Sequence, residues 1–218
     1  MQEKITDRYL KPGYFTNSDH PDVQDFVIEK TKGHEHLEYK LNALYYAVRD
    51  GFKYDPYTLD FSKEAMRASH LVNRDYGYCV EKSCLFVAGA RILGVPARLG
   101  FANVRNHIGT AKLEEILQTN TLVFHGYAEI FWNDRWLKLT PVFNESLCHM
   151  LNVEPLAFQL DDDSIFQEYD KNGGKFMEYT HQYGHFEDIP YELFMSELAA
   201  HYPHLAENFQ DGKLIKLK

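Results

Sequence analysis

The sequence predicts a mixed α+β domain in which one buried helix packs against an antiparallel sheet. The first observation is an apolar run at helical spacing that follows Cys79 and stops at Gly94 and Pro96. The second is a pair of β-rich runs on either side of the turn-forming pair Asn133-Asp134, which predicts a hairpin. With 218 residues and 44% hydrophobic residues, the chain is long enough to bury a core around these elements.

The rest of the chain predicts further helices before and after this core. Residues 20–50 contain two amphipathic patterns, which end at Gly33 and Gly51 and predict two packing helices. We expect a strand over 97–104 and a short surface helix over 110–117. A last helix should begin at Asp188 and Pro190 and close before Pro203, and residues 213–218 predict a final strand or a frayed tail.

We expect one domain over residues 1–218, because no linker, internal repeat or low-complexity tract divides the chain. It would consist of N-terminal helices at about 20–50, a core at about 70–145 and a C-terminal packing segment at about 146–218. The aromatic residues of that last segment predict that it covers the core.

Cys79 is the first candidate for a reactive side chain. It follows Gly77 and stands where the predicted helix begins, and a helix N-terminus favours an anion. We therefore expect a lowered pKa for the Cys79 thiol. Cys84 lies within the helix among apolar residues, and Cys148 has no adjacent base, so we interpret both as structural.

A nucleophilic thiol needs a base, and His125 is the main candidate. A turn at Asn133-Asp134 would place Thr140 diagonally opposite His125 on the same face of the hairpin. That register predicts three facing pairs: Phe131 with Trp136, Glu129 with Lys138, and Tyr127 with Thr140. The alternative base is His107, which lies in a loop beside a cation and an amide. Arg98, after Pro96, is expected to pair with a carboxylate of the sheet.

Two sequence stretches carry a resemblance to a known family. GYCVEKSCLFVAGARILGVPAR begins at Gly77, and HGYAEIFWNDRWLKLTP begins at His125. Together they resemble the transglutaminase-like superfamily, whose fold is papain-like. The resemblance implies Cys79 as nucleophile and His125 as base. It also places an aspartate where this sequence has Thr140, so the third member of the triad would be Thr140 or, alternatively, Asn144.

The function that this resemblance implies is cysteine-dependent acyl transfer on amide bonds. We expect hydrolysis by a cysteine peptidase or amidase, because no stretch of the sequence predicts a site for an amine acceptor. One alternative is transfer to an amine, as in a transglutaminase. The other is a catalytically silent domain of the same fold that binds peptides or proteins, which the missing aspartate would favour.

Composition restricts the partners. The formal charge of −9 and a pI of about 5.6 argue against nucleic acid, which requires clustered lysine and arginine side chains. No segment has the length and hydropathy of a membrane span, and the first residues lack an apolar signal core. Three cysteines without paired spacing fit a reducing compartment, so we expect a cytoplasmic protein. Its partner would be a peptide, a protein or a small amide.

We expect no cofactor and no metal site. The acidic run Asp161-Asp162-Asp163 lacks the glycine and the distal glutamate of a calcium loop, and its residues are interpreted as helix caps. His181 and His185 have the spacing of a zinc hydrolase motif, but Gln182 stands where the motif needs a glutamate.

Overall fold

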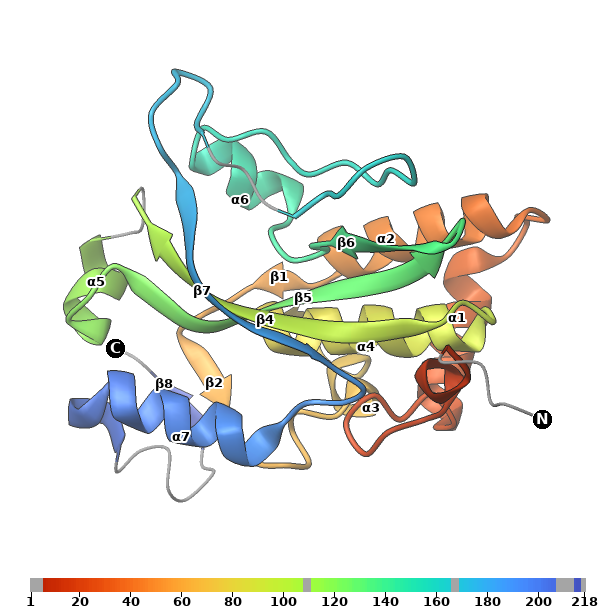
Figure 1. The fold of residues 1–218 in the computed structure, drawn as a ribbon, viewed down its shortest axis with the longest axis horizontal. Helices are drawn as coiled ribbons and strands as arrows, with labels where there is room; N and C mark the ends of the chain where they lie inside the picture. Colours follow the sequence, from red (N-terminus) through yellow and green to blue (C-terminus); the bar gives the residue numbers. More distant parts are fainter. Residues whose placement is uncertain (1–5, 108–110, 166–168, 207–213, 217–218) are drawn as a thin grey trace.

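A computed structural model describes residues 6–107, 111–165, 169–206 and 214–216, and Figure 1 shows their arrangement. The helices are η1 (Asp7–Leu10), α1 (Pro21–Thr31), α2 (Leu37–Gly51), α3 (Ala68–Leu71), α4 (Cys79–Ile92), α5 (Ala111–Leu117), α6 (Glu145–Met150), α7 (Tyr191–His201) and η2 (Pro203–Leu205). The strands are β1 (Lys53–Tyr54), β2 (Thr58–Asp60), β3 (Tyr76–Gly77), β4 (Ala97–Asn106), β5 (Thr121–Trp132), β6 (Arg135–Leu139), β7 (Met177–Phe186) and β8 (Leu214–Lys216).

The central sheet is antiparallel, with the strand order β6-β5-β4-β7. The hairpin between β5 and β6 has the register that the sequence predicts, because Phe131 pairs with Trp136 and Glu129 with Lys138. Asn133 and Asp134 both have positive φ values, 48° and 61°, as the tightest hairpin turns require. The mixed α+β class is therefore confirmed, with one long helix lying along the sheet.

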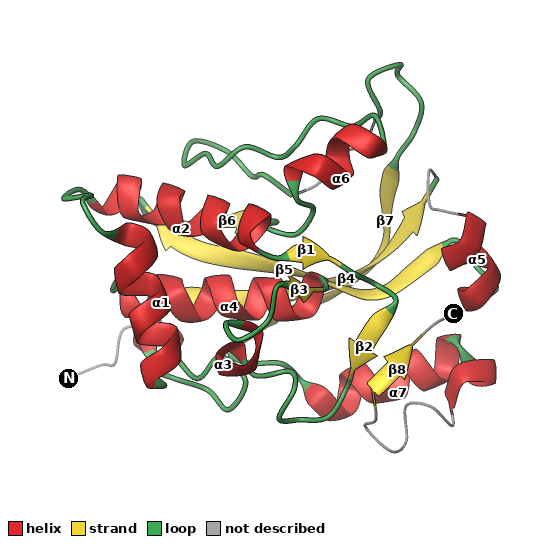
Figure 2. Cartoon of the chain, turned by 180° about the vertical axis from the view of Figure 1, so that it is seen from behind, coloured by secondary structure: helices red, strands yellow, loops and turns green. Residues whose placement is uncertain are grey.

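That helix is α4, and it is the centre of the molecule. Its residues from Cys79 to Arg91 are all buried, so the helix is covered on every side instead of along one stripe. Figure 2 shows α1, α2 and α4 together on one face of the sheet. The other helices therefore shield α4 on the sides that the sheet does not cover.

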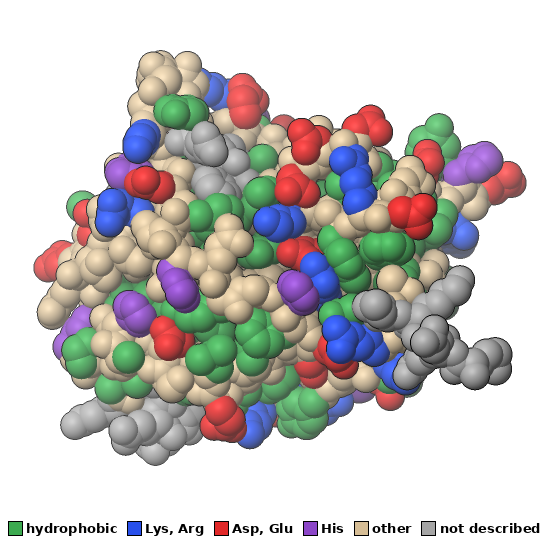
Figure 3. Space-filling model, in the orientation of Figure 1, with side chains coloured by type: hydrophobic (Ala, Val, Ile, Leu, Met, Phe, Trp, Pro, Cys, Tyr) green, Lys and Arg blue, Asp and Glu red, His purple; other side chains and the backbone are tan. Residues whose placement is uncertain are grey.

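The opposite face of the sheet is held by a buried ion pair. Arg98 Nε donates to Glu129 Oε2 across 2.5 Å, which confirms that Arg98 pairs with a carboxylate of the sheet. The guanidinium also lies over the ring of Trp136, with 3.8 Å from its carbon to the ring centroid. Figure 3 views the molecule from this side and shows acidic and basic side chains interspersed over the surface.

The helices that the sequence predicts at both ends of the chain are confirmed. α1 and α2 end close to Gly33 and Gly51, and α7 begins directly after Pro190. α5 matches the predicted surface helix, except that residue 110 lies outside the described residues. The backbone of β8 pairs with β2, so residues 214–216 form the predicted strand, whereas 213 and 217–218 lie outside the described residues.

Two features differ from the sequence-based expectation. β7 was not predicted, because Gly184 (φ 91°) and two shifts in register interrupt its alternation of polar and apolar residues. The interpretation of Asp161–Asp163 as helix caps is wrong. Residues 161–165 form no helix, and Asp163 instead accepts a hydrogen bond from the Lys138 N–H at the edge of the sheet.

A buried lysine joins α4 to three other segments. Lys82 is fully buried, and its Nζ donates to the carbonyl oxygens of Arg49, Phe52 and Val142 at 2.8, 2.7 and 2.5 Å. Burial lowers the pKa of Lys82 to about 7. Three acceptors use all three N–H bonds of an ammonium, so the geometry requires the charged form. This cation fixes the end of α2, the approach to β1 and the segment after β6 relative to α4.

Replacing Lys82 by methionine, which has a similar shape, should therefore destabilise the fold. Three buried carbonyl oxygens would lose their donor, at a cost of about 1–3 kcal/mol for a single unsatisfied group, and we expect a loss of about 3 kcal/mol or more in the free energy of unfolding, measured by urea denaturation. Lys32→Met, at an exposed position after α1, is the matched control and should change stability little. Equal stability of Lys82→Met and the unchanged protein would contradict this role.

Candidate active site

Cys79 is the first residue of α4, as the sequence predicts. The helix start is fixed by Glu81, whose Oε2 accepts a hydrogen bond from the Tyr78 N–H at 3.1 Å. Arg74 forms an ion pair with the other oxygen of the same carboxylate. The first turn is therefore held by a buried, paired charge, and the position of Cys79 is correspondingly well defined.

The electrostatic expectation for Cys79 is wrong in its direction. Burial raises the pKa of the Cys79 thiol to about 11, because only 7% of the residue is exposed and a thiolate would lose its hydration. The backbone amides of Gly126, Val80 and Cys79 itself lower the pKa, but by less. The amides at the helix N-terminus thus lower the pKa of the thiol, as expected, but desolvation raises it by more. At neutral pH the resting side chain is a thiol.

The proximity of Cys79 to β5 follows from a glycine. A side chain at Gly126 would bring its Cβ to 3.0 Å from the Cα of Val80, the residue after Cys79. Only glycine lets the strand approach the first turn of α4 this closely. Because His125 precedes Gly126, this contact brings the base candidate to the same end of α4 as the thiol.

His125 lies directly after a bulge in β5. The register between β4 and β5 shifts between Ala102 and Val104, and Phe124 has a φ of 59°, a conformation that is rare for a bulky residue. The shift lies outside the pairing with β6, so it leaves the hairpin register intact. Bulges of this kind re-aim neighbouring side chains and concentrate near active sites.

Two side chains take up the backbone N–H groups that the bulge frees from the ladder. Asn103 Oδ1 accepts from the Phe124 N–H at 3.0 Å, and the Tyr202 hydroxyl accepts from the Val123 N–H at 2.8 Å. The same hydroxyl donates to the carbonyl oxygen of Thr121 at 2.7 Å. Asn103 and Tyr202 therefore support the strained backbone before His125. Nothing in the local sequence pattern marks either residue for this role.

The imidazole of His125 is buried and electrically neutral at pH 7. Burial alone lowers its pKa to about 4, since only 1% of the residue is exposed. Within the described part of the chain, neither ring nitrogen has a hydrogen-bond partner, and the ring of Phe143 lies 6.0 Å away between centroids. A neutral ring with an uncommitted nitrogen is the form that accepts a proton from a thiol.

The two candidates for the third triad position lie near the end of β6. Thr140 follows that strand, and its Oγ1 is buried without a hydrogen-bond partner among the described residues. Asn144 uses its amide elsewhere: its Oδ1 accepts from the Tyr54 N–H at 3.0 Å and its Nδ2 donates to Ser146 Oγ at 2.6 Å. In the described ranges neither side chain is hydrogen-bonded to His125, so a supporting role for either stays a prediction.

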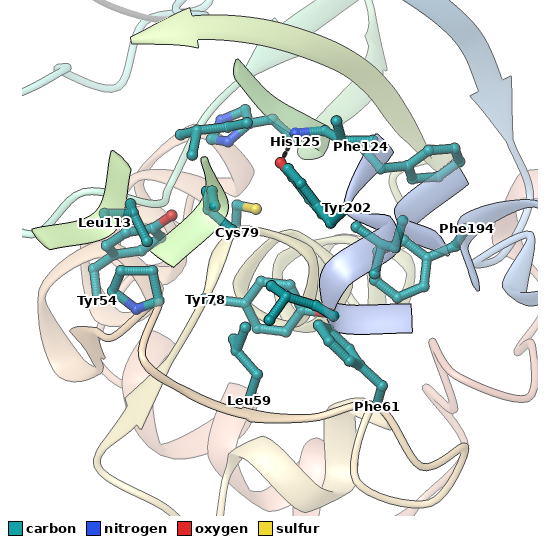
Figure 4. A pocket seen from close by; sticks show the side chains of 16 residues that line it. Tyr54, Leu59, Phe61, Tyr78, Cys79, Leu113, Phe124, His125, Phe194 and Tyr202 are labelled. Atoms are coloured by element: carbon teal, nitrogen blue, oxygen red, sulfur yellow. Dashed lines mark hydrogen bonds between the residues drawn. The ribbon is translucent and has the colours of Figure 1, made fainter. Parts of the chain in front are cut away.

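Cys79 and His125 line one pocket, which we call the Cys79 pocket. Its volume is about 80 Å³. Figure 4 shows the sulfur of Cys79 directed into the space between Tyr202 and Tyr78, away from the imidazole of His125. The remaining lining residues are Tyr54, Pro56, Leu59, Phe61, Leu113, Leu117, Leu122, Val123, Phe124, Phe194, Leu198 and Leu205.

The competing candidates lie outside this pocket. Cys84 and Cys148 are fully buried, and the Cys148 thiol faces the carbonyl oxygen of Phe143. His107 stands beyond the end of β4, with its Nε2 3.4 Å from Glu178 Oε2. In the described ranges no group of three or more His, Cys, Asp or Glu residues is arranged to hold a metal ion. None of the helices described here combines the length and hydropathy needed to cross a bilayer.

Comparisons with known proteins identify the family. A profile of the Transglutaminase-like superfamily matches residues 24–141, more than half of the chain. The chain therefore belongs to the transglutaminase-like superfamily. No curated protein sequence matches it.

A solved structure shows the same fold. A candidate cysteine protease from Cytophaga hutchinsonii superposes with a TM-score of 0.50 at 16% identity, over 82% of this chain and 64% of that protein. A candidate protease from Parabacteroides distasonis gives a TM-score of 0.37 at 10% identity, over 58% of this chain and 26% of that one. This chain thus spans about two thirds of the length of the Cytophaga protein, and the predicted papain-like, transglutaminase-core fold is confirmed.

The role of Tyr202 can be tested by removing its hydroxyl. Tyr202→Phe keeps the ring but leaves the Val123 N–H and the Thr121 carbonyl without this partner, so we expect a loss of about 1–3 kcal/mol in unfolding free energy. The measurement is urea denaturation. Tyr39→Phe, at a residue 58% exposed, should leave stability nearly unchanged. If Tyr202→Phe costs no more than this control, the hydroxyl does not support the bulge.

Proposed function

We propose that this protein is a cysteine hydrolase that cleaves amide bonds, with Cys79 as nucleophile and His125 as general base. The observation that carries the proposal is that both side chains line one pocket, one at the start of the central helix and the other on the adjacent strand. Membership of the transglutaminase-like superfamily and the fold shared with a candidate cysteine protease support a cysteine-dependent enzyme in general.

The proposed reaction begins from two neutral groups. The sulfur of Cys79 attacks the amide carbonyl carbon while its proton passes to a ring nitrogen of His125, forming a C–S bond and an oxyanion. The backbone amides at the sulfur, those of Cys79, Val80 and Gly126, are the donors available to that oxyanion. The imidazolium then protonates the leaving amine as the C–N bond breaks. Water hydrolyses the resulting thioester and restores the thiol.

The burial of Cys79 and His125 determines how costly it is to transfer the proton from the thiol to the imidazole. The pKa of the thiol is raised to about 11 and that of the imidazole lowered to about 4, so an ion pair is disfavoured in the resting pocket. Proton transfer must therefore accompany the attack, when the developing charges stabilise each other at short range. In this proposal Thr140, or alternatively Asn144, accepts the second ring N–H once His125 becomes charged.

Hydrolysis is preferred over transfer to an amine. Acyl transfer to an amine needs a second site that holds the amine close to the thioester, and the lining of the Cys79 pocket contains no acidic side chain that would attract an amine.

A catalytically silent peptide-binding domain is the second candidate function. The observation in its favour is that His125 and Thr140 have no hydrogen bond to each other in the described structure. Three cysteines without the spacing of disulfide pairs support the reducing, cytoplasmic location that we also propose.

A thiol-directed probe that mimics an amide tests the nucleophile. Cys79→Ser should abolish labelling of the intact protein, because it removes the only thiol that lines the pocket. Cys84→Ser is the matched control on the same helix and should label as the unchanged protein does. The measurement is the mass of the intact protein after reaction. Equal labelling of the two variants would remove Cys79 from the mechanism.

A further inference from the structure

A second pocket adjoins the Cys79 pocket, and we call it the Met150 pocket. Its volume is about 180 Å³. Four residues line both pockets, so the two spaces are separated by one shared wall: Tyr54, Pro56, Leu113 and Leu122. The residues that line the Met150 pocket alone are Tyr57, Asn106, Phe143, Leu147, Met150, Leu151, Phe176 and Met177.

The shared wall lies beside the proposed reacting groups. Tyr54 packs edge-to-face on Phe143 with 4.8 Å between ring centroids, and Phe143 is also the ring that contacts His125. Asn144 holds the backbone of Tyr54 in place through the 3.0 Å hydrogen bond from its N–H. The wall is therefore a fixed feature next to His125. An extended chain bound at Cys79 would have one pocket on each side of this wall.

Both pockets are chemically suited to large apolar groups. No lysine, arginine, aspartate or glutamate lines either one, and burial keeps the single imidazole neutral. Met150 is 72% exposed at its pocket, which leaves a large apolar side chain in contact with water. A bound apolar group would cover it. Any charged group would lose its hydration in these pockets without gaining a partner of opposite charge.

Besides the two ring nitrogens of His125, one buried polar side-chain atom of the Cys79 pocket has no partner in the described structure. The hydroxyl of Tyr78 is buried and unpaired, on a residue only 7% exposed. The hydroxyl of Tyr202, which also lines the Cys79 pocket, is satisfied by backbone groups of β5. An unpaired buried hydroxyl is costly, and a ligand oxygen or nitrogen would satisfy it. It therefore indicates that the pocket is built to hold a bound molecule.

We propose that the substrate is a peptide that carries large apolar side chains on both sides of the cleaved amide, one in each pocket. This inference rests on the proposed function, because it places the amide at Cys79. The Tyr78 hydroxyl donates to a polar atom of the peptide in the Cys79 pocket. The shared wall separates the two side chains and leaves the amide between them at the sulfur.

Four peptides test this substrate class. Each is a blocked tetrapeptide with glycine at both ends and two central residues, which are leucine–leucine, leucine–serine, serine–leucine or serine–serine. Their dissociation constants are measured by calorimetry on Cys79→Ala, which cannot turn them over. Their kcat/KM values are measured on the unchanged protein by chromatography of the products. Each leucine should improve both quantities by about tenfold or more, because it buries a large apolar side chain.

Two variants assign the side chains to the pockets. Met150→Glu places a charge at the exposed edge of the Met150 pocket, and Leu205→Glu places one at a half-buried edge of the Cys79 pocket. Each should weaken binding of only those peptides whose leucine enters that pocket, by about tenfold. Ile28→Glu, on an α1 residue 64% exposed, is the matched control and should change nothing. Met150→Glu alone suffices if Leu205→Glu does not fold.

The outcomes separate this inference from the proposed function. If all four peptides bind Cys79→Ala equally, or serine–serine binds best, the apolar substrate class is overturned whatever the turnover. If leucine–leucine binds tightly but the unchanged protein does not cleave it, the substrate class holds and hydrolysis by Cys79 fails. Selective binding together with cleavage that Cys79→Ala abolishes supports both.

Discussion

The site depends on one close backbone contact, between the strand β5 at Gly126 and the first turn of α4 at Val80. The residues on either side of this contact are the two reactive candidates, Cys79 on the helix and His125 on the strand. Because a Cβ at position 126 would stand 3.0 Å from a backbone carbon, neither element can shift to accept a side chain there without disturbing the other. The distance between strand and helix is therefore set by the absence of one methyl group.

Buried cations that donate hydrogen bonds to backbone carbonyls keep the surrounding segments in place. Lys82 binds three carbonyl oxygens and connects α2, β1 and the segment after β6 to α4. Arg91, near the other end of the same helix, donates to the carbonyl oxygens of Lys11, Ala97 and Glu187. Both ends of α4 are thus anchored by polar contacts that work at long range in the sequence. Apolar packing alone would not fix the positions of the bound segments as precisely as these directional hydrogen bonds do.

Local sequence patterns predicted the parts of the fold that local physics determines. The spacing of apolar residues located α4, and the turn residues at Asn133 fixed the register of the hairpin with β6. The side chains that support the bulge before His125 were not predicted, because they lie far from it in the sequence. Tyr202, which follows α7, and Asn103 of β4 each accept a hydrogen bond from a backbone N–H of β5. The direction of the pKa shift at Cys79 was missed for a related reason. The helix dipole is visible in the sequence, whereas the burial that outweighs it depends on the residues that close around the pocket.

The central claim is that a neutral thiol and a neutral imidazole line the same apolar pocket at rest, and that they become charged only during the attack. The most direct measurement is the rate at which iodoacetamide alkylates Cys79 in the free protein between pH 6 and pH 10.5, followed by the mass of the labelled peptide. Because burial raises the pKa of the thiol to about 11, we expect the rate constant to keep rising over this whole range. A rate that reaches its plateau below pH 8 would mean that a thiolate already exists at rest, and it would contradict the account.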